Sequence, residues 1–373
     1  MRLKLKKKNC AIALIILFVL LFEIINPIKL YSSYQVRNHN YSKNSATKLV
    51  EYGLKKEILS DEYNKFIDVN ANSKKFIVDN YKIYKDIEYY DDVHDIDLVN
   101  KLISKEYGVQ AINCILNSGT KESVLELLEK AKYDDETIIN FLEFDYAKLN
   151  NLDRYIDYQK KTINDYDDTV LYVEIGLDNE FYTEYNQISE FSYDMLVNKY
   201  NKLDKDYVPK DLIKVDSKYT TDSNNSGNKV MLENFYKMAD DLNKETNLKI
   251  YIRSGYRSYE SQEDVYDSYL KSYGQNYVKK YVAYPGFSEH QTGLAIDIKA
   301  STSEIFANTK ESNWLKKNAY KYGFILRYAK SMEEVTGYQN EEWHYRYVGL
   351  EVAKYIHENN MSFDEYCVRF NNK

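Results

Sequence analysis

A short alternating run near residue 295 organises the hydrophobic pattern of the second half of the chain. Leu294, Ile296 and Ile298 alternate with Ala295 and Asp297, which is the period of a half-buried strand. Asp297 therefore points away from the large aliphatic side chains. A Pro-Gly pair and a Thr-Gly pair before the run predict turns on both sides of a histidine. These turns can bring an imidazole from the loop and a carboxylate from the strand to one point.

Other periodic segments of this region predict an irregular mixture of helices and strands. Residues 230–242 form an amphipathic helix with Phe235 and Leu242 on one face. Ser362 and Glu365 predict a capping box at the start of a last helix. Further strands are predicted over 248–253, 324–328 and 343–348, and further helices over 314–322 and 350–357. Because strands and helices do not alternate regularly, the predicted fold class is α+β and not doubly wound α/β.

The chain before this region is predicted to be a polar tether followed by a helical domain. Residues 31–45 are rich in Ser, Asn and Tyr, which suits an exposed tether. Residues 46–165 are predicted to be mainly helical, and Thr120 provides an N-cap ahead of an apolar helix face. The pattern becomes β-rich at 170–177, which places the domain boundary between about 160 and 190. The helical part is interpreted as a spacer or interaction domain whose partner the sequence does not identify.

The first 30 residues combine a basic start with an apolar run, which is the pattern of an exported protein. The run from Cys10 to Phe22 is 13 residues long, shorter than the about 20 residues of a full span. No A-x-A-like cleavage site follows it, so a retained signal anchor at 1–30 is preferred to a cleaved signal peptide. The expected location is the cell membrane, crossed once, with the remainder of the chain on the extracellular side.

Composition and charge narrow the class of protein. The 373 residues are 44% hydrophobic and 29% charged, which is typical of a globular protein. Residues 1–30 carry six basic residues and one acidic residue, so the other 343 residues hold a charge of −12 within the total of −7. This negative charge argues against a nucleic acid as a binding partner of the chain after residue 30. Cys114 and Cys367 lie far apart in the sequence and are interpreted as buried free thiols, although nothing forbids their pairing.

A second cluster, EEWHYRY at residues 341–347, completes a candidate metal site. His290, Asp297 and His344 are two imidazoles and one carboxylate, a common set of protein ligands for a catalytic zinc that leaves a fourth position for water. Glu341 is a further carboxylate, suited to act as general base. A histidine beside a strand is also often a hydrogen-bonded core residue, and spacing alone leaves both interpretations open.

Four motifs in one order carry a resemblance to a known family. They are SGYRS at 254–258, SEHQTGLAID at 288–297, YGFILRY at 322–328 followed by TGY at 336–338, and EEWHYRYVG at 341–349. Together they closely resemble the VanY-type D-alanyl-D-alanine carboxypeptidases over about residues 195–360. The resemblance implies an α+β zinc carboxypeptidase domain with a small antiparallel sheet over residues 190–373.

The resemblance implies roles for the metal-site residues. His290, Asp297 and His344 would bind Zn²⁺, and Glu341, three residues before the last ligand, would be the general base. Since residues three apart on a strand face opposite sides, Glu341 is expected on the loop before the strand that carries His344. Glu342 stands where the family usually has proline, and the three-residue offset favours Glu341 over it as the base.

The resemblance also implies contacts with a substrate. Arg257 would stabilise a developing oxyanion or hold a substrate carboxylate. Ser288 and Gln262 would make polar contacts with the substrate, and Trp343 would form a wall of the pocket. Simple packing is an equally open interpretation for Gln262 and Trp343, and a surface ion pair is the alternative for Arg257.

The favoured function is therefore a membrane-anchored, zinc-dependent D-alanyl-D-alanine carboxypeptidase that trims peptidoglycan stem peptides. An L,D-carboxypeptidase or a peptidoglycan endopeptidase would use the same four metal and base residues. A different class, a non-catalytic protein that binds the cell wall or a partner through the helical region, is disfavoured by the complete ligand set. A serine-type carboxypeptidase is disfavoured as well, because no S-x-x-K motif is accompanied by S-D-N and K-T-G.

Overall fold

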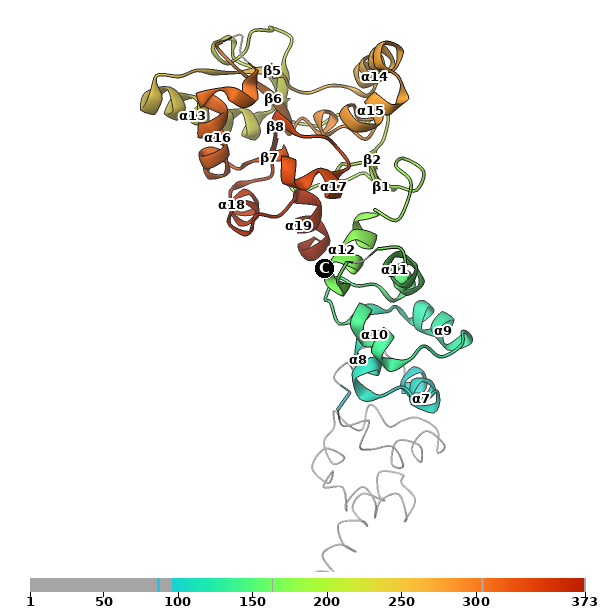
Figure 1. Cartoon of the computed structure of the whole chain (residues 1–373). Coiled ribbons are helices and arrows are strands. Elements are labelled where there is room, and N and C mark those ends of the chain that lie inside the picture. The colour runs from blue at the N-terminus through green and yellow to red at the C-terminus, as the bar shows by residue number, and fades with distance from the viewer. Residues whose placement is uncertain (1–85, 88–95, 163, 303–304, 372–373) are drawn as a thin grey trace, which may run out of the picture. The chain divides into compact units, whose positions relative to one another are not determined.

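The structure is a computed structural model that describes residues 86–87, 96–162, 164–302 and 305–371 (Figure 1). Within these residues the chain forms two compact units, and the division falls between Leu152 and Asp153. The anchor predicted at 1–30 and the tether predicted at 31–45 lie outside the described residues. In the described part, no helix is both long enough and apolar enough to cross a membrane.

The first unit is a series of short helices, and the described part of residues 46–165 is helical as predicted. Its elements are α7 (Ile96–Ser104), α8 (Val109–Ser118), α9 (Lys121–Glu129), α10 (Asp135–Leu142) and the 3₁₀ helix η1 (Leu149–Asn151). The Thr120 side chain accepts a hydrogen bond from the Ser123 N–H at the start of α9, which is the predicted cap. Ile112 and Ile138 are fully buried, so the unit has a small core of its own.

Residues 170–177 are mostly helical, and the prediction of a β-rich segment there was wrong. The helices α11 (Leu152–Gln159) and α12 (Tyr166–Ile175) follow η1. Asp165 caps α12 by accepting a hydrogen bond from the Asp168 N–H, and Gly176 ends the helix in the left-handed conformation with φ of 106°. Most of the last half of α12 is buried, so its apolar residues run together without the helical period and resemble a buried strand.

A four-stranded antiparallel sheet forms the centre of the second unit, in the order β5-β6-β8-β7. Its strands are β5 (Ile250–Ser254), β6 (Ala295–Ala300), β7 (Phe324–Tyr328) and β8 (Glu341–Tyr347). Two smaller sheets pair β1 (Asn186–Ile188) with β2 (Asn201–Leu203) in parallel, and β3 (Leu212–Lys214) with β4 (Ser226–Asn228) in antiparallel orientation. The mixture of this sheet with helices confirms the predicted α+β class.

Helices lie around the four-stranded sheet (Figure 1). They are α13 (Lys229–Thr246), α14 (Tyr259–Tyr273), α15 (Gln275–Tyr281), α16 (Lys310–Asn318), α17 (Glu333–Thr336), α18 (Leu350–Asn359) and α19 (Phe363–Phe370). Short 3₁₀ helices in the connections are η2 (Ser217–Tyr219), η3 (Glu289–Thr292), η4 (Phe306–Asn308), η5 (Ala319–Tyr322) and η6 (Lys330–Met332). In the view of Figure 1, α14 and α15 lie to the right of the strands, and α13 and α16 lie to the left.

The core of the second unit forms where α13 packs on the sheet. Phe235 and Leu242, on the predicted apolar face of α13, are fully buried in one cluster with Ile296 and Ile298 of β6. Burying a side chain of this size stabilises the fold by about 1.5–3 kcal/mol relative to exposure. Because side chains alternate along β6, the same packing turns Asp297 to the opposite face of the sheet. The core therefore determines the direction of this carboxylate.

Candidate active site

The three predicted metal ligands meet on the two central strands of the sheet and the loop before them. His290 lies on η3, Asp297 on β6 and His344 on β8, and the antiparallel register pairs Asp297 directly with His344. Oδ1 of Asp297 lies 3.5 Å from Nε2 of His290 and 3.4 Å from Nδ1 of His344. One donor atom from each residue lies within 4.8 Å of the others, so a single cation can contact all three.

Each imidazole has its second ring nitrogen held by an oxygen atom. Nδ1 of His290 lies 2.7 Å from the Gly255 carbonyl oxygen, and Nε2 of His344 lies 3.1 Å from Oε2 of Glu289. Because these oxygens can only accept, Nδ1 of His290 and Nε2 of His344 are the protonated nitrogens that donate. The other nitrogen of each ring, Nε2 of His290 and Nδ1 of His344, keeps a lone pair that can bind a metal. Oδ1 of Asp297 is buried and has no hydrogen-bond partner. Two lone pairs and an unpartnered carboxylate oxygen fit a zinc ion and not a hydrogen-bonded core.

Glycines allow the backbone approach that orients His290. A Cβ atom on Gly255 would lie 2.3 Å from the main-chain oxygen of Ser226, so no larger residue fits here without moving the strand end. Gly293 has φ of 70°, the left-handed conformation that favours glycine, and it ends η3 two residues before the start of β6. The glycines of the two motifs therefore determine where His290 stands relative to Asp297.

Glu341 lies inside β8 and not on the loop before it, so that part of the prediction was wrong. Leu326 of β7 pairs with Tyr345, whereas Tyr328, two residues later in β7, pairs with Glu341, four residues earlier in β8. Two extra residues in β8 thus interrupt the ladder and the alternation of its side chains. As a result Glu341 and His344 face the same site, with 3.7 Å between Oε2 of the glutamate and Nδ1 of the histidine.

Of the two adjacent glutamates, Glu341 is the one that faces the metal ligands. Burial raises the pKa of Glu341 to about 7. A carboxyl group with a pKa in this range both takes up and releases a proton near neutral pH. Glu342 instead forms an ion pair with Lys316, with 2.5 Å between Oε2 and Nζ. Glu341 is therefore the candidate general base.

Glu289, which the sequence analysis did not single out, holds His344 from the side opposite Asp297. Its Oε1 accepts hydrogen bonds from Nε of Arg327 at 2.8 Å and from Nη1 of Arg346 at 3.3 Å. These three side chains are fully buried. Burial alone would raise the pKa of Glu289, but the two guanidinium groups hold it well below its usual range. A glutamate directly before the first ligand, with arginines in two other motifs, was the sequence signal for this network.

Glu289→Gln is expected to weaken metal binding and the fold together. Glutamine keeps the shape of the side chain but removes the carboxylate that Arg327 and Arg346 share. Arg327 keeps a second carboxylate, Asp364, at 2.7 Å, whereas Arg346 loses its carboxylate partner. Breaking such a buried pair costs about 3–5 kcal/mol. The looser hold on His344 is expected to lower the zinc affinity by about 10- to 100-fold. Urea unfolding and a competitive zinc titration measure the two effects.

The matched control is Asp240→Asn, at a surface ion pair with Lys218 whose N–O distance is 2.7 Å. Exposed pairs of this kind contribute little to stability, so this variant should keep both properties of the wild type. A wild-type zinc affinity in Glu289→Gln would show that His344 does not depend on Glu289.

The ligands open into a pocket of about 400 Å³ that brings all the predicted site residues together. Arg257 donates from Nη1 to Oε1 of Gln262 at 2.7 Å and from Nη2 to Oγ of Ser254 at 2.9 Å. Nε2 of Gln262 donates in turn to a main-chain carbonyl group at 2.7 Å. Gln262 thus has protein partners at both ends and positions Arg257. Ser288 and Trp343 line the pocket with them.

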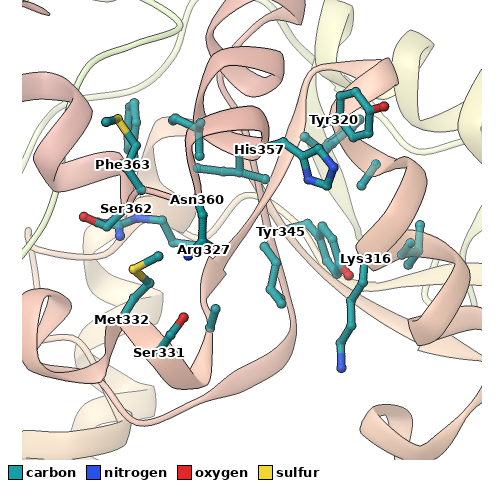
Figure 2. A pocket seen from close by; sticks show the side chains of 18 residues that line it. Lys316, Tyr320, Arg327, Ser331, Met332, Tyr345, His357, Asn360, Ser362 and Phe363 are labelled. Atoms are coloured by element: carbon teal, nitrogen blue, oxygen red, sulfur yellow. The ribbon is translucent and has the colours of Figure 1, made fainter.

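A second cavity, of about 270 Å³, lies against β7 and α18. Figure 2 shows the side chains that line it, among them Arg327, Tyr345 and His357, whose ring stacks on Tyr320 with centroids 4.0 Å apart. Within the described residues, the group of three possible metal ligands lies in the other pocket and not here. The pocket with the three ligands is therefore the candidate active site.

Comparison with known proteins identifies the class of this domain. The family model VanY, D-alanyl-D-alanine carboxypeptidase, matches residues 224–350. YodJ of Bacillus subtilis (strain 168), named as a carboxypeptidase, is 39% identical over 178 residues, which are 46% of this chain and 65% of YodJ. The solved LdcB LD-carboxypeptidase is 36% identical with a TM-score of 0.45, over 50% of this chain and 92% of LdcB. A VanY D,D-pentapeptidase of a VanB-type vancomycin resistance cassette, solved with Zn(II), is 31% identical with a TM-score of 0.42, over 47% of this chain and 98% of the other.

The second unit therefore carries a VanY-type carboxypeptidase domain, as the four motifs predicted. The chain spans just under two thirds of the length of YodJ, so the match concerns this domain and not a whole relative. Two histidines and one aspartate around one point agree with the zinc that was predicted as its cofactor. The domain is thus of the zinc metallopeptidase class.

Proposed function

We propose that this domain is a zinc-dependent D-alanyl-D-alanine carboxypeptidase that removes the terminal D-alanine from peptidoglycan stem peptides. The observation that carries the proposal is the convergence of three metal donors, a buried glutamate and an arginine in one pocket. The match of residues 224–350 to the VanY family supports it. Peptidoglycan lies outside the membrane, in agreement with the orientation predicted from the basic N-terminal residues.

The residues of the pocket divide the chemistry of hydrolysis between them. Zinc, when bound by His290, Asp297 and His344, lowers the pKa of water and polarises a carbonyl oxygen. Glu341 takes one proton from the water that attacks the scissile carbonyl carbon. As the C–N bond breaks, the same carboxyl group delivers that proton to the amine of the departing D-alanine. One water molecule is consumed for each peptide bond.

Arg257 favours a carboxypeptidase over an endopeptidase. Its hydrogen-bond partners, Gln262 and Ser254, are both neutral, so they orient the guanidinium group without neutralising its charge. Burial disfavours the charged form of Arg257 and so lowers its pKa, whereas the negative charges of Asp297 and Glu341 act in the opposite direction. A forked cation at the edge of a pocket suits the free carboxylate that only the end of a peptide carries.

An L,D-carboxypeptidase is the second candidate on the same residues. Its substrate, a stem that ends in a single D-alanine, presents the same terminal carboxylate to Arg257. The configuration of the residue before the cleaved bond distinguishes the two activities, and the side chains of the pocket wall select it. The complete ligand set disfavours a non-catalytic wall-binding protein.

The test follows the loss of one alanine from defined stems by mass spectrometry. The full chain in detergent is incubated with a pentapeptide stem ending in D-Ala-D-Ala, a tetrapeptide stem ending in one D-Ala, and a cross-linked stem dimer. We expect release from the pentapeptide that stops with a chelator and returns with zinc. Release from the tetrapeptide alone would assign the L,D activity, and cleavage of the dimer alone would assign an endopeptidase. Zinc-loaded protein that cleaves none of the three would overturn the proposal.

A further inference from the structure

Four tyrosines form a column of rings across α14 and α15. Tyr269 and Tyr273 lie on α14, Tyr277 and Tyr281 lie on α15, and the two helices lie side by side (Figure 1). The ring of Tyr277 stacks on those of Tyr273 and Tyr281, with centroids 4.6 Å apart in both pairs and planes inclined by 26° and 28°. Tyr269 is nearly parallel to Tyr277, at 10° and 6.1 Å. Within each helix a spacing of four residues places two rings on one face, and the contact between the helices brings the two pairs together.

This tyrosine column is not the core of the two helices. Tyr266, Val278 and Val282 are buried and form that core, and Tyr277 of the column packs against it. In the column, Tyr273 is 62% exposed and Tyr269 is 39% exposed. Exposed aromatic side chains that gather on one face are typical of a surface that binds a ligand.

The column is continuous with the catalytic pocket. Tyr269, Tyr277 and Tyr281 line the same pocket as Arg257 and the metal ligands, and Tyr273 lies beyond that lining. A substrate whose end is seated at the metal ligands can therefore extend along the rings as far as Tyr273.

We infer that the tyrosine column is a saccharide subsite for the glycan to which the stem peptide is attached, an inference that rests on the proposed function. A sugar ring has an apolar C–H face and a rim of hydroxyl groups, and tyrosine offers the matching combination of an apolar ring and a polar edge. Four stem residues separate the cleaved bond from the sugar, which is about 13–14 Å of extended chain. The sugar thus lies near the rim of the pocket when the terminal D-alanine is at the ligands.

The kinetic test compares a free pentapeptide stem with the same stem linked to a GlcNAc-MurNAc disaccharide. The wild type should show about five- to tenfold higher kcat/KM for the linked stem, mainly through KM, as expected for one ring contact. Tyr273→Ala should lose this preference and cleave the free stem as the wild type does. Tyr273→Phe keeps the ring and should keep most of the preference.

Tyr355→Ala is the control, because Tyr355 on α18 is 40% exposed and is not among the residues that line the pocket. It should leave the preference for the linked stem unchanged. Equal wild-type values for the two stems, or an equal loss on both stems in Tyr273→Ala, would overturn the inference.

A binding measurement separates this inference from the proposed function. In Glu341→Gln, calorimetry with the same two stems should show about five- to tenfold tighter binding of the linked stem, and adding Tyr273→Ala should remove the difference. If the wild type cleaves neither stem but this difference is present, the proposed function fails and the saccharide subsite stands. If the linked stem binds no more tightly, the subsite is wrong whatever the enzyme cleaves.

Discussion

Glu341→Gln is expected to lower kcat by about a thousandfold and to leave zinc bound, because general acid-base groups contribute about 10²–10⁴-fold to the rate. Glutamine fills the same buried space, but its amide cannot take a proton from water or return one to the leaving amine. The metal donors His290, Asp297 and His344 are unchanged. Single-turnover release of D-alanine, measured beside the zinc content of the same sample, separates the lost chemistry from a lost metal.

The control for this variant is the neighbouring substitution, Glu342→Gln. Glu342 pairs with Lys316 at 2.5 Å and not with the metal ligands, so its change should leave kcat within about threefold of the wild type, the scale of a single ion pair. Loss of activity in Glu342→Gln together with a normal rate in Glu341→Gln would reverse the assignment of the base. Loss of zinc from Glu341→Gln would instead show that Glu341 is needed for metal binding.

Asp297→Asn is expected to abolish both zinc binding and activity. Oδ1 of Asp297 lies 3.5 Å from the nearest ring nitrogen of His290 and 3.4 Å from that of His344. Asp297 is the one carboxylate among the three donors, so it supplies their negative charge. An asparagine of the same size removes that charge and directs a neutral amide to the site. Metal analysis should fall from one zinc per chain to a trace, and D-alanine release should fall below detection.

Thermal unfolding gives a second measure of the same loss. Zinc at 100 times its dissociation constant stabilises the native state by about 2.7 kcal/mol, which is about 5–10 °C for a domain of this size. Addition of a chelator should therefore lower the Tm of the wild type by that amount and leave the Tm of Asp297→Asn unchanged. Asp240→Asn, on the surface, should respond as the wild type does. A variant that still binds one zinc would show that Asp297 is not a ligand.

Much of the local structure could be predicted because neighbouring residues determine it. The period of residues 230–242 predicted α13, and the alternation from Leu294 to Ile298 predicted β6 with its carboxylate away from the core. The capping box of Ser362 and Glu365 is present at the start of α19. Such features depend on side chains within one or two turns or on one pleat, so the sequence contains them in full.

Other features depend on strand pairing, which a sequence pattern does not specify. The alternation rule placed Glu341 on a loop, whereas two extra residues in the β7–β8 ladder bring it to the same face as His344. Residues 170–177 were predicted as β-rich because a helix buried on most sides lacks the amphipathic period. Strand pairing decided the first outcome and burial by distant segments decided the second, and neither follows from local preference.

The sequence by itself determined the donor types, their order and the family to which they point. Only the tertiary structure decided which atoms of these residues are free for a metal. Gly255 and Glu289 occupy one ring nitrogen of each histidine, and Lys316 withdraws Glu342 from the site. Gly255 is 35 positions from His290, Glu289 is 55 positions from His344, and Lys316 is 26 positions from Glu342. Contacts over such separations arise only when the sheet and its helices are packed, because packing and not sequence spacing brings the groups together.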